Sequence, residues 1–159
     1  MSFKADIGII GAMDDEVREI ISRLQDKKTE MISGIEFNLG ELFGKKVVIA
    51  KCGVGKVFAA ICAEAMIIKY APDLVVNTGV GGALDKSLRP LDIVFADRVL
   101  QYDMDTSPIG DPVGLISGIN IVKIPASSEL SDKVKKAAEE LGINCVKGVI
   151  ASLVLRTGS

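Results

Sequence analysis

The sequence predicts an α/β fold in three layers, with helices on both faces of a mostly parallel sheet. Short apolar runs typical of strands alternate along the chain with segments that have a helical pattern. Apolar residues make up 48% of the chain and aromatic residues only 4%, so aliphatic side chains must form the core, as in parallel strands buried on both faces. With 159 residues, the chain is expected to form a single domain, 1–159.

The first strand and the first helix are expected to meet at a cluster of acidic residues. Residues 7–12 are apolar and rich in β-branched side chains, and from Val17 onward apolar residues follow the spacing of a helix face. Asp14, Asp15 and Glu16 therefore open a helix at the carboxyl end of a strand, where open α/β sheets bind ligands. Taken alone, the acids are better explained by their favourable interaction with the helix dipole than by chemistry.

A hairpin and a long helix are expected next. Residues 34–42 alternate apolar and polar side chains and lead into a second buried strand at 47–50. After a turn at 51–56, a helix is expected at about 57–70, and its side chains are apolar nearly all round. A helix without a polar face is expected to be buried.

The turn before that helix resembles phosphate-binding motifs only in part. Residues 53–55 begin like the dinucleotide fingerprint, but Phe58 stands where the third glycine belongs. The P-loop pattern does not fit either, because Val57 follows Lys56. A tight connection from strand to helix is the favoured interpretation.

The second half of the chain continues the alternation. It is expected to contain strands at 74–76, 92–100, 121–124 and 145–151, and an amphipathic helix at 130–141 closed by Gly142. The first of these strands runs into 77–83, where three glycines in four positions would let the backbone turn sharply and approach a ligand closely. Residues 79–82 are explained equally by a structural turn. Residues 101–120 show little periodicity and are interpreted as a long loop, which is often functional.

Composition argues against several kinds of partner and chemistry. The formal charge is −2 without a basic tract, so nucleic acid is not expected. No apolar run is long enough to span a membrane, and the first residues lack the pattern of a secretory signal, so a cytoplasmic protein is expected. Cys52, Cys62 and Cys145 lack metal-site spacing and are expected to be buried thiols. Without any histidine, acid-base chemistry must rest on carboxylates or on less usual groups.

Four motifs together resemble one enzyme family. They are IIGAMDDEV at 9–17, GVGKV at 53–57, NTGVGG at 77–82 and DIV at 92–94. In this order they closely resemble the 5′-methylthioadenosine/S-adenosylhomocysteine nucleosidases of the purine nucleoside phosphorylase superfamily. The resemblance implies a three-layer α/β/α phosphorylase/nucleosidase-like fold with a mostly parallel, twisted mixed sheet. It also implies a homodimer without metal or organic cofactor, which hydrolyses the bond between adenine and the 5-thio-ribose of a small thio-nucleoside.

The resemblance implies a catalytic role for Glu16. This residue matches the glutamate that orients and deprotonates the attacking water in the family, while Ala12 and Met13 match the same end of the pocket. Cleavage of an N-glycosidic bond needs a general base on one side of the ribose and a proton donor for the leaving base on the other. A carboxylate at a half-buried helix start can be that base.

Further positions match substrate contacts of the family. Val54 matches the apolar residue that faces the alkylthio group. Val80, Gly81 and Gly82 match the loop beside ribose and base, with Val80 in place of a serine that many members have. In the long loop, Thr106 and Ile109 match positions that reach the pocket of the neighbouring subunit.

The resemblance covers about residues 1–151 and gives way to a divergent tail at 152–159. The family's Met-Glu pair, which holds the ribose hydroxyls, and its Ser-Asp pair, which protonates adenine, have no counterpart in this sequence. We therefore expect a truncated or frame-shifted nucleosidase whose sheet is incomplete at the C-terminal end. Two alternatives to an active hydrolase stay open: a non-catalytic adenosine-binding or assembly module, and a nucleoside phosphorylase.

Overall fold

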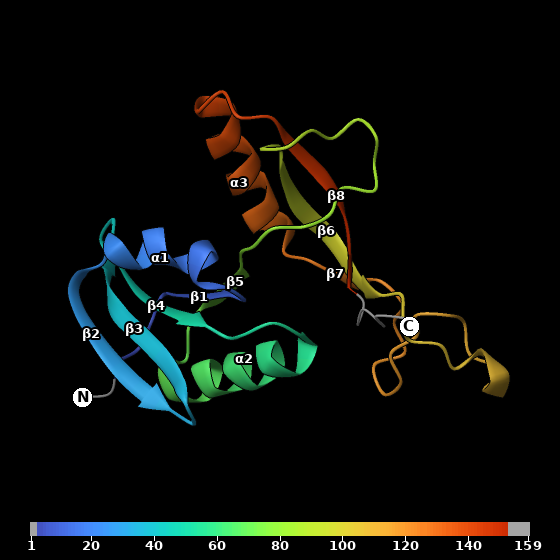
Figure 1. Cartoon of the computed structure of the whole chain (residues 1–159), viewed down its shortest axis with the longest axis horizontal. Coiled ribbons are helices and arrows are strands. Elements are labelled where there is room, and N and C mark those ends of the chain that lie inside the picture. Colours follow the sequence, from blue (N-terminus) through green and yellow to red (C-terminus); the bar gives the residue numbers. More distant parts are fainter. Residues whose placement is uncertain (1–2, 153–159) are drawn as a thin grey trace, which may run out of the picture. The chain divides into compact units, whose positions relative to one another are not determined.

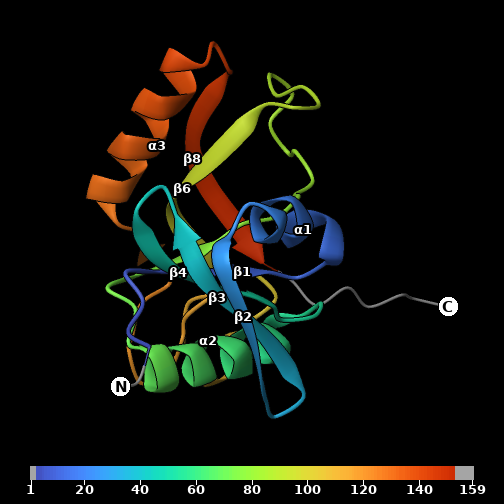
Figure 2. The same ribbon diagram turned by 90° about the vertical axis from the view of Figure 1, so that its left-hand side faces the viewer.

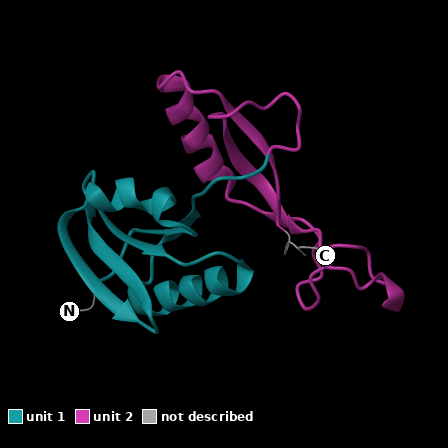
Figure 3. Ribbon diagram, in the orientation of Figure 1, with its two compact units in different colours: residues 1–82 teal, residues 83–159 magenta. Residues whose placement is uncertain are grey.

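The computed structural model describes residues 3–152, which divide between two compact units, 1–82 and 83–159 (Figure 3). Each unit has a sheet of its own. The single domain 1–159 stays a prediction, and the divergent tail lies outside the described residues from residue 153 onward. No helix within residues 3–152 has the length and apolar character to cross a membrane.

Unit 1 is built on a mixed sheet of five strands in the order β2-β3-β4-β1-β5 (Figure 1). The strands are β1 (Ile7–Gly11), β2 (Gln25–Ile32), β3 (Ile35–Leu42), β4 (Lys45–Lys51) and β5 (Leu74–Asn77). β1 pairs in parallel with both β4 and β5, whereas β3 pairs antiparallel with β2 and β4. The two helices of this unit are α1 (Asp14–Ser22) and α2 (Lys56–Tyr70).

The helices of unit 1 cover opposite faces of its sheet. Val48 and Ala50 of β4 belong to the cluster that contains the buried side chains of α2. Val47 and Ile49, which alternate with them along the strand, pack with Val17 of α1 instead. Seen from the side of β2, the sheet passes between α1 and α2 (Figure 2). The three layers that the sequence predicts are therefore confirmed in this unit.

The helix α2 corrects one expectation, because the sequence predicts that it is buried. Only Cys62, Met66 and Tyr70 are buried, at the i, i+4 and i+8 positions of one stripe. Large apolar side chains on the rest of the helix are exposed, including Val57 and Ile68 at 72% and 76%. The pattern identified the helix correctly but could not tell how much of its surface the chain would cover.

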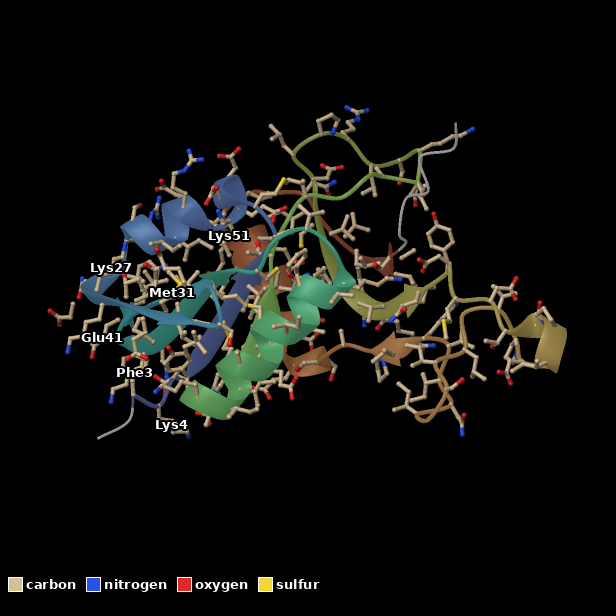
Figure 4. All side chains as sticks on the ribbon, turned by 60° about the horizontal axis from the view of Figure 1, so that its bottom comes forward. Phe3, Lys4, Lys27, Met31, Glu41 and Lys51 are labelled. Atoms are coloured by element: carbon tan, nitrogen blue, oxygen red, sulfur yellow. The ribbon has the colours of Figure 1, made fainter. Side chains whose placement is uncertain are left out.

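The outer strand β2 was not predicted, because its sequence QDKKTEMI does not alternate apolar and polar residues. Its side chains are largely exposed, among them Lys27 and Met31, which Figure 4 labels together with Glu41 on the adjacent β3. A side-chain hydrogen bond joins β2 to α2, from the Tyr70 hydroxyl to Glu30 Oε2 at 3.0 Å. Burial and this bond raise the pKa of Tyr70.

Unit 2 has a sheet of three strands in the order β7-β6-β8. Its elements are β6 (Ile93–Gln101), a 3-10 helix η1 (Ser107–Ile109), β7 (Ile124–Pro125), α3 (Ser128–Glu140) and β8 (Cys145–Ser152). β6 pairs in parallel with β8 and antiparallel with β7, and α3 packs on both β6 and β8. The Ser127 hydroxyl caps α3 by accepting a hydrogen bond from the Leu130 N–H at 3.4 Å.

Most of the second half follows the sequence prediction. Gln101 still belongs to β6, and η1 is the only helix or strand in the rest of the expected loop at 101–120. Gly142 adopts the left-handed conformation directly after Leu141, the residue that caps the end of α3. The strand expected at 121–124 is wrong in position, since β7 begins at Ile124, while Ile121 makes an isolated bridge to Ile116. The fold class is confirmed as mixed α/β. Three of the six strand pairs within residues 3–152 are antiparallel, which is more than the sequence predicts.

Candidate functional site

The acidic helix start at the end of β1 forms the centre of the candidate site. β1 ends at Gly11, and Met13 keeps an extended backbone (φ −124°, ψ 159°) as the residue that caps α1. Glu16 is the third residue of the helix, so its side chain can turn back toward the N–H groups that no helical carbonyl accepts. The expected change from strand to helix thus places a carboxylate beside unpaired backbone donors.

Three backbone N–H groups hold the Glu16 carboxylate. Oε2 accepts hydrogen bonds from Ala12 N–H at 2.7 Å and from Met13 N–H at 3.0 Å. Oε1 accepts one from Val80 N–H at 2.9 Å, across 64 residues of sequence. The carboxylate therefore joins the start of α1 to the loop that follows β5.

The two oxygens of this carboxylate are not equivalent. A carboxylate oxygen offers two acceptor positions. Among the donors of residues 3–152, N–H groups occupy both positions on Oε2, whereas a single N–H group donates to Oε1. A water molecule that donates to Glu16 would therefore be bound at Oε1, close to Val80.

Burial and hydrogen bonding act in opposite directions on Glu16. Partial burial raises its pKa, but the N–H groups of Val80, Met13 and Ala12 together outweigh that effect, so the pKa lies below its ordinary value. The negative charge of Glu16 is close enough to help raise the pKa of the Cys52 thiol, although burial contributes more. At neutral pH the candidate base is therefore ionised, and the buried thiol is protonated.

Glu16 is expected to stabilise unit 1 only while it is ionised. Because its pKa is lower in the folded chain than the ordinary 4.5, the stabilisation is present above that value and is lost as the pH falls through the folded pKa. The free energy of unfolding should thus fall more steeply in the wild type than in Glu16→Gln when the pH drops from about 5 to about 3. Urea unfolding across this range measures the difference, and a difference that stays constant with pH would contradict the assignment.

The other two acids at the helix start have different partners. Asp14 pairs with Lys51, which is labelled in Figure 4, at 2.9 Å. Asp15 pairs with Arg18 one turn later in the same helix. All four side chains are largely exposed, so these are surface ion pairs that add little to stability. For Asp14 and Asp15 the structure thus favours the interpretation as helix-start residues.

The structure brings together only some of the predicted site residues. Ala12, Met13 and Val80 surround Glu16 through their backbone N–H groups, and Gly81 and Gly82 directly follow Val80. The side chain of Val80 is 81% exposed and takes no part in this contact. The loss of the serine hydroxyl at this position therefore leaves the backbone contact intact. Substrate-binding roles for these residues stay predictions.

Val54 lies in the turn between β4 and α2. Gly53 and Gly55 on either side of it have φ values of +90° and +115°, a region that other residues rarely adopt, so the predicted tight turn is confirmed. The Val54 side chain is 72% exposed. Its expected contact with an alkylthio group stays a prediction.

Thr106 and Ile109 lie in unit 2, at η1. The Thr106 hydroxyl donates a hydrogen bond to Asp111 Oδ2 at 2.9 Å, and Ile109 is exposed. Their expected reach into the pocket of a neighbouring subunit stays a prediction. Of the three cysteines, Cys52 and Cys62 are buried as expected, whereas Cys145 is partly exposed.

Two glycines adjoin Glu16, and no sequence pattern indicates a role for them at this residue. A Cβ on Gly79 would lie 2.7 Å from Glu16 Oε1. A Cβ on Gly11 would lie 3.1 Å from Glu16 Cβ and 2.6 Å from Val17 Cγ1. Gly11 is the last residue of β1, and Gly79 follows the end of β5 by two residues. A glycine at the carboxyl end of a strand is a sequence signal for a close approach of the backbone, but it does not identify Glu16 as the group approached.

Comparisons with known proteins agree with the resemblance seen in the sequence. A sequence profile described as "Phosphorylase superfamily" matches residues 6–154. The 5′-methylthioadenosine/S-adenosylhomocysteine nucleosidase of Shewanella loihica is 39% identical over 147 residues, which are 92% of this chain and 64% of that protein. This chain thus spans slightly less than two thirds of that relative's length.

Solved structures show the same similarity. The nucleosidase of the same name from Neisseria meningitidis, in complex with methylthio-immucillin-A, has a TM-score of 0.90 and 29% identity, over 94% of this chain and 64% of that one. A mutant of futalosine hydrolase from Helicobacter pylori has a TM-score of 0.89 and 31% identity, over 96% and 66%. These relatives and the profile, which matches nearly the whole sequence, confirm the predicted family resemblance and fold. This chain belongs to the phosphorylase superfamily.

Proposed function

We propose that this protein hydrolyses the N-glycosidic bond of 5′-methylthioadenosine and S-adenosylhomocysteine, with Glu16 as the base that activates water. The observation that carries the proposal is the state of Glu16. It is an ionised carboxylate held by three N–H groups, and one acceptor position on Oε1 is left open by the part of the chain that the structure describes. The names of the relatives from Shewanella loihica and Neisseria meningitidis support the choice of substrate.

The proposed step balances as a simple hydrolysis. Water bound at Oε1 attacks C1′ of the ribose as the bond from C1′ to the adenine nitrogen breaks, and the electrons of that bond leave with adenine. The water proton passes to Glu16, and the departing adenine takes up a proton from solvent on the opposite side. Glu16 then releases its proton to solvent, so that one water is consumed for each bond broken. Glu16 supplies the water-activating half of this reaction.

The fixed position of Glu16 suits this role. Its two oxygens are held from α1 and from the loop after β5, so the base does not have to be ordered when substrate binds. Its lowered pKa makes it a weak base, but keeps it in the required ionised form at neutral pH. Its contribution would then combine acceptance of the water proton with a fixed position of the water.

The test is to incubate the purified chain with 5′-methylthioadenosine while measuring both free adenine and nucleoside binding. Adenine released in proportion to the protein, at a rate independent of phosphate, supports the nucleosidase. A rate that requires phosphate, with a ribose phosphate as second product, supports a phosphorylase. Binding of the nucleoside without release of adenine supports the non-catalytic module, and neither binding nor release overturns the proposal.

The 5′ substituent of the substrate is a separate question. The similarity to futalosine hydrolase suggests futalosine as a second candidate substrate. Val54 has a largely exposed side chain, so it would restrict the size of a 5′ group little. Comparison of kcat/KM for 5′-methylthioadenosine and futalosine distinguishes the two candidates.

We further propose that the protein acts as a homodimer in the cytoplasm, with Thr106 and Ile109 directed to the partner's pocket. The exposed apolar side chains of α2 support the dimer, because an apolar surface of this kind is commonly covered by another subunit. Sedimentation equilibrium tests it, and a monomeric mass at micromolar concentration would rule it out.

A further inference from the structure

The loop after β5 approaches Glu16 most closely at Gly79. Thr78, just before it, is fixed to the sheet because its N–H donates to the Ile10 carbonyl at 2.9 Å. Val80, just after it, donates its N–H to Glu16 Oε1. Gly79 therefore lies between a residue anchored to β1 and a residue anchored to the candidate base.

A side chain at position 79 would occupy the space of the carboxylate. The three nearest atoms to a Cβ built there are all from Glu16: Oε1 at 2.7 Å, Cδ at 3.1 Å and Oε2 at 3.3 Å. The first of these distances is shorter than carbon and oxygen atoms normally approach without repulsion. The backbone itself does not require glycine, because Gly79 is not among the residues with positive φ.

We propose that Gly79 is a positioning residue for Glu16, because the absence of its side chain lets the loop after β5 close on the carboxylate and hold Oε1. This inference rests on the proposed role of Glu16 as the base. It goes beyond that role by explaining what keeps Oε1 within reach of Val80 N–H. It also predicts that a single methyl group at position 79 changes the site while the fold is kept.

The fold should tolerate alanine at position 79, because the group in conflict with the methyl is the end of a flexible side chain. Glu16 can rotate away, but it then gives up the hydrogen bond from Val80 and at least part of those from Ala12 and Met13. The three N–H groups are what lower its pKa, so that pKa should rise toward the ordinary value.

The experiment is an NMR titration of the whole chain that follows the Glu16 carboxyl carbon and the amide protons of Ala12, Met13 and Val80. Glu16→Gln identifies the carboxyl signal. In the wild type, the three amide signals should titrate together with Glu16. In Gly79→Ala, the carboxyl should titrate at a higher pH and the Val80 amide should lose its response. Unchanged titrations in Gly79→Ala would overturn the inference.

Gly81→Ala is the matched control. A Cβ at Gly81 meets no atom within 4 Å, and its φ is not positive, so the added methyl is the same but the contact with Glu16 is absent. This variant should titrate like the wild type at Glu16, Ala12 and Met13. If it changes the Glu16 titration as much as Gly79→Ala does, the effect belongs to the loop in general and the inference fails.

A second measurement covers the case in which Gly79→Ala folds poorly. In a Glu16→Ala background the space of the carboxylate is empty, so Gly79→Ala should cost much less stability there than in the wild type. An equal cost in both backgrounds would show that the methyl meets something other than Glu16, and would overturn the proposal. Neither measurement uses adenine release, so a failure of the proposed nucleosidase activity is distinguishable from a failure of this inference.

Discussion

Glu16→Gln is expected to lower the rate of adenine release by about 10²–10⁴-fold, the usual contribution of a general base. The amide cannot take the proton of the attacking water. It also has only one oxygen, whereas three N–H groups point at the two oxygens of the carboxylate, so its NH2 group must face at least one N–H. The measurement is the initial rate of adenine release at saturating 5′-methylthioadenosine.

Asp15→Asn is the control for this substitution. It removes the same charge one residue earlier in the same helix turn, from a side chain that is exposed and paired with Arg18. We expect it to leave the rate within about twofold of the wild type, because an exposed ion pair contributes little. Equal losses in both variants would show that negative charge at the helix start matters rather than the carboxylate of Glu16.

Phe37→Ala is expected to lower the free energy of unfolding by about 3–5 kcal/mol. Phe37 is completely buried on β3, in the cluster that joins the sheet to α2. Its ring packs against that of Tyr70, with a centroid distance of 5.5 Å. Truncation would remove these contacts and leave a cavity next to Tyr70. Urea unfolding followed by circular dichroism measures the effect.

Phe43→Ala is the matched control for the core substitution. Phe43 is 90% exposed at the turn between β3 and β4, so the same truncation removes little buried surface. A change within about 0.5 kcal/mol is expected, as for most surface substitutions. A loss as large as that of Phe37→Ala would mean that the turn is covered in solution, contrary to the exposure of this side chain.

The sequence predicted the elements whose pattern reflects burial and missed those whose pattern does not. Strands β1 and β4 were found because continuous apolar runs of β-branched residues are typical of strands covered on both faces. β2 has exposed charged side chains and is defined by its pairing with β3, which leaves no periodic signal. The exposure of α2 was missed because apolar character does not reveal which surface covers a helix.

For the candidate site, the sequence could identify the carboxylate but not what holds it. Glu16 stood out only through the order of the motifs around it, since acids are common in the first turn of a helix. Its contact with Val80 joins residues 64 positions apart through a backbone group, and backbone donors have no sequence signature. For the same reason the sequence indicates a role for Val80 only through its side chain, whereas its backbone N–H makes the contact with Glu16.

The strand β4 links the two helical layers of unit 1 in one cooperative structure. Its buried residues alternate between the cluster on the side of α2 and the cluster on the side of α1, so neither helix can detach without exposing part of a strand that the other also packs on. Local opening that would release α1 alone is therefore costly. Val17, which follows Glu16, packs in the cluster of Val47 and Ile49. The position of the Glu16 carboxylate thus depends on β4, in the middle of the sheet. A substitution of a buried β4 residue would displace this carboxylate without contacting it.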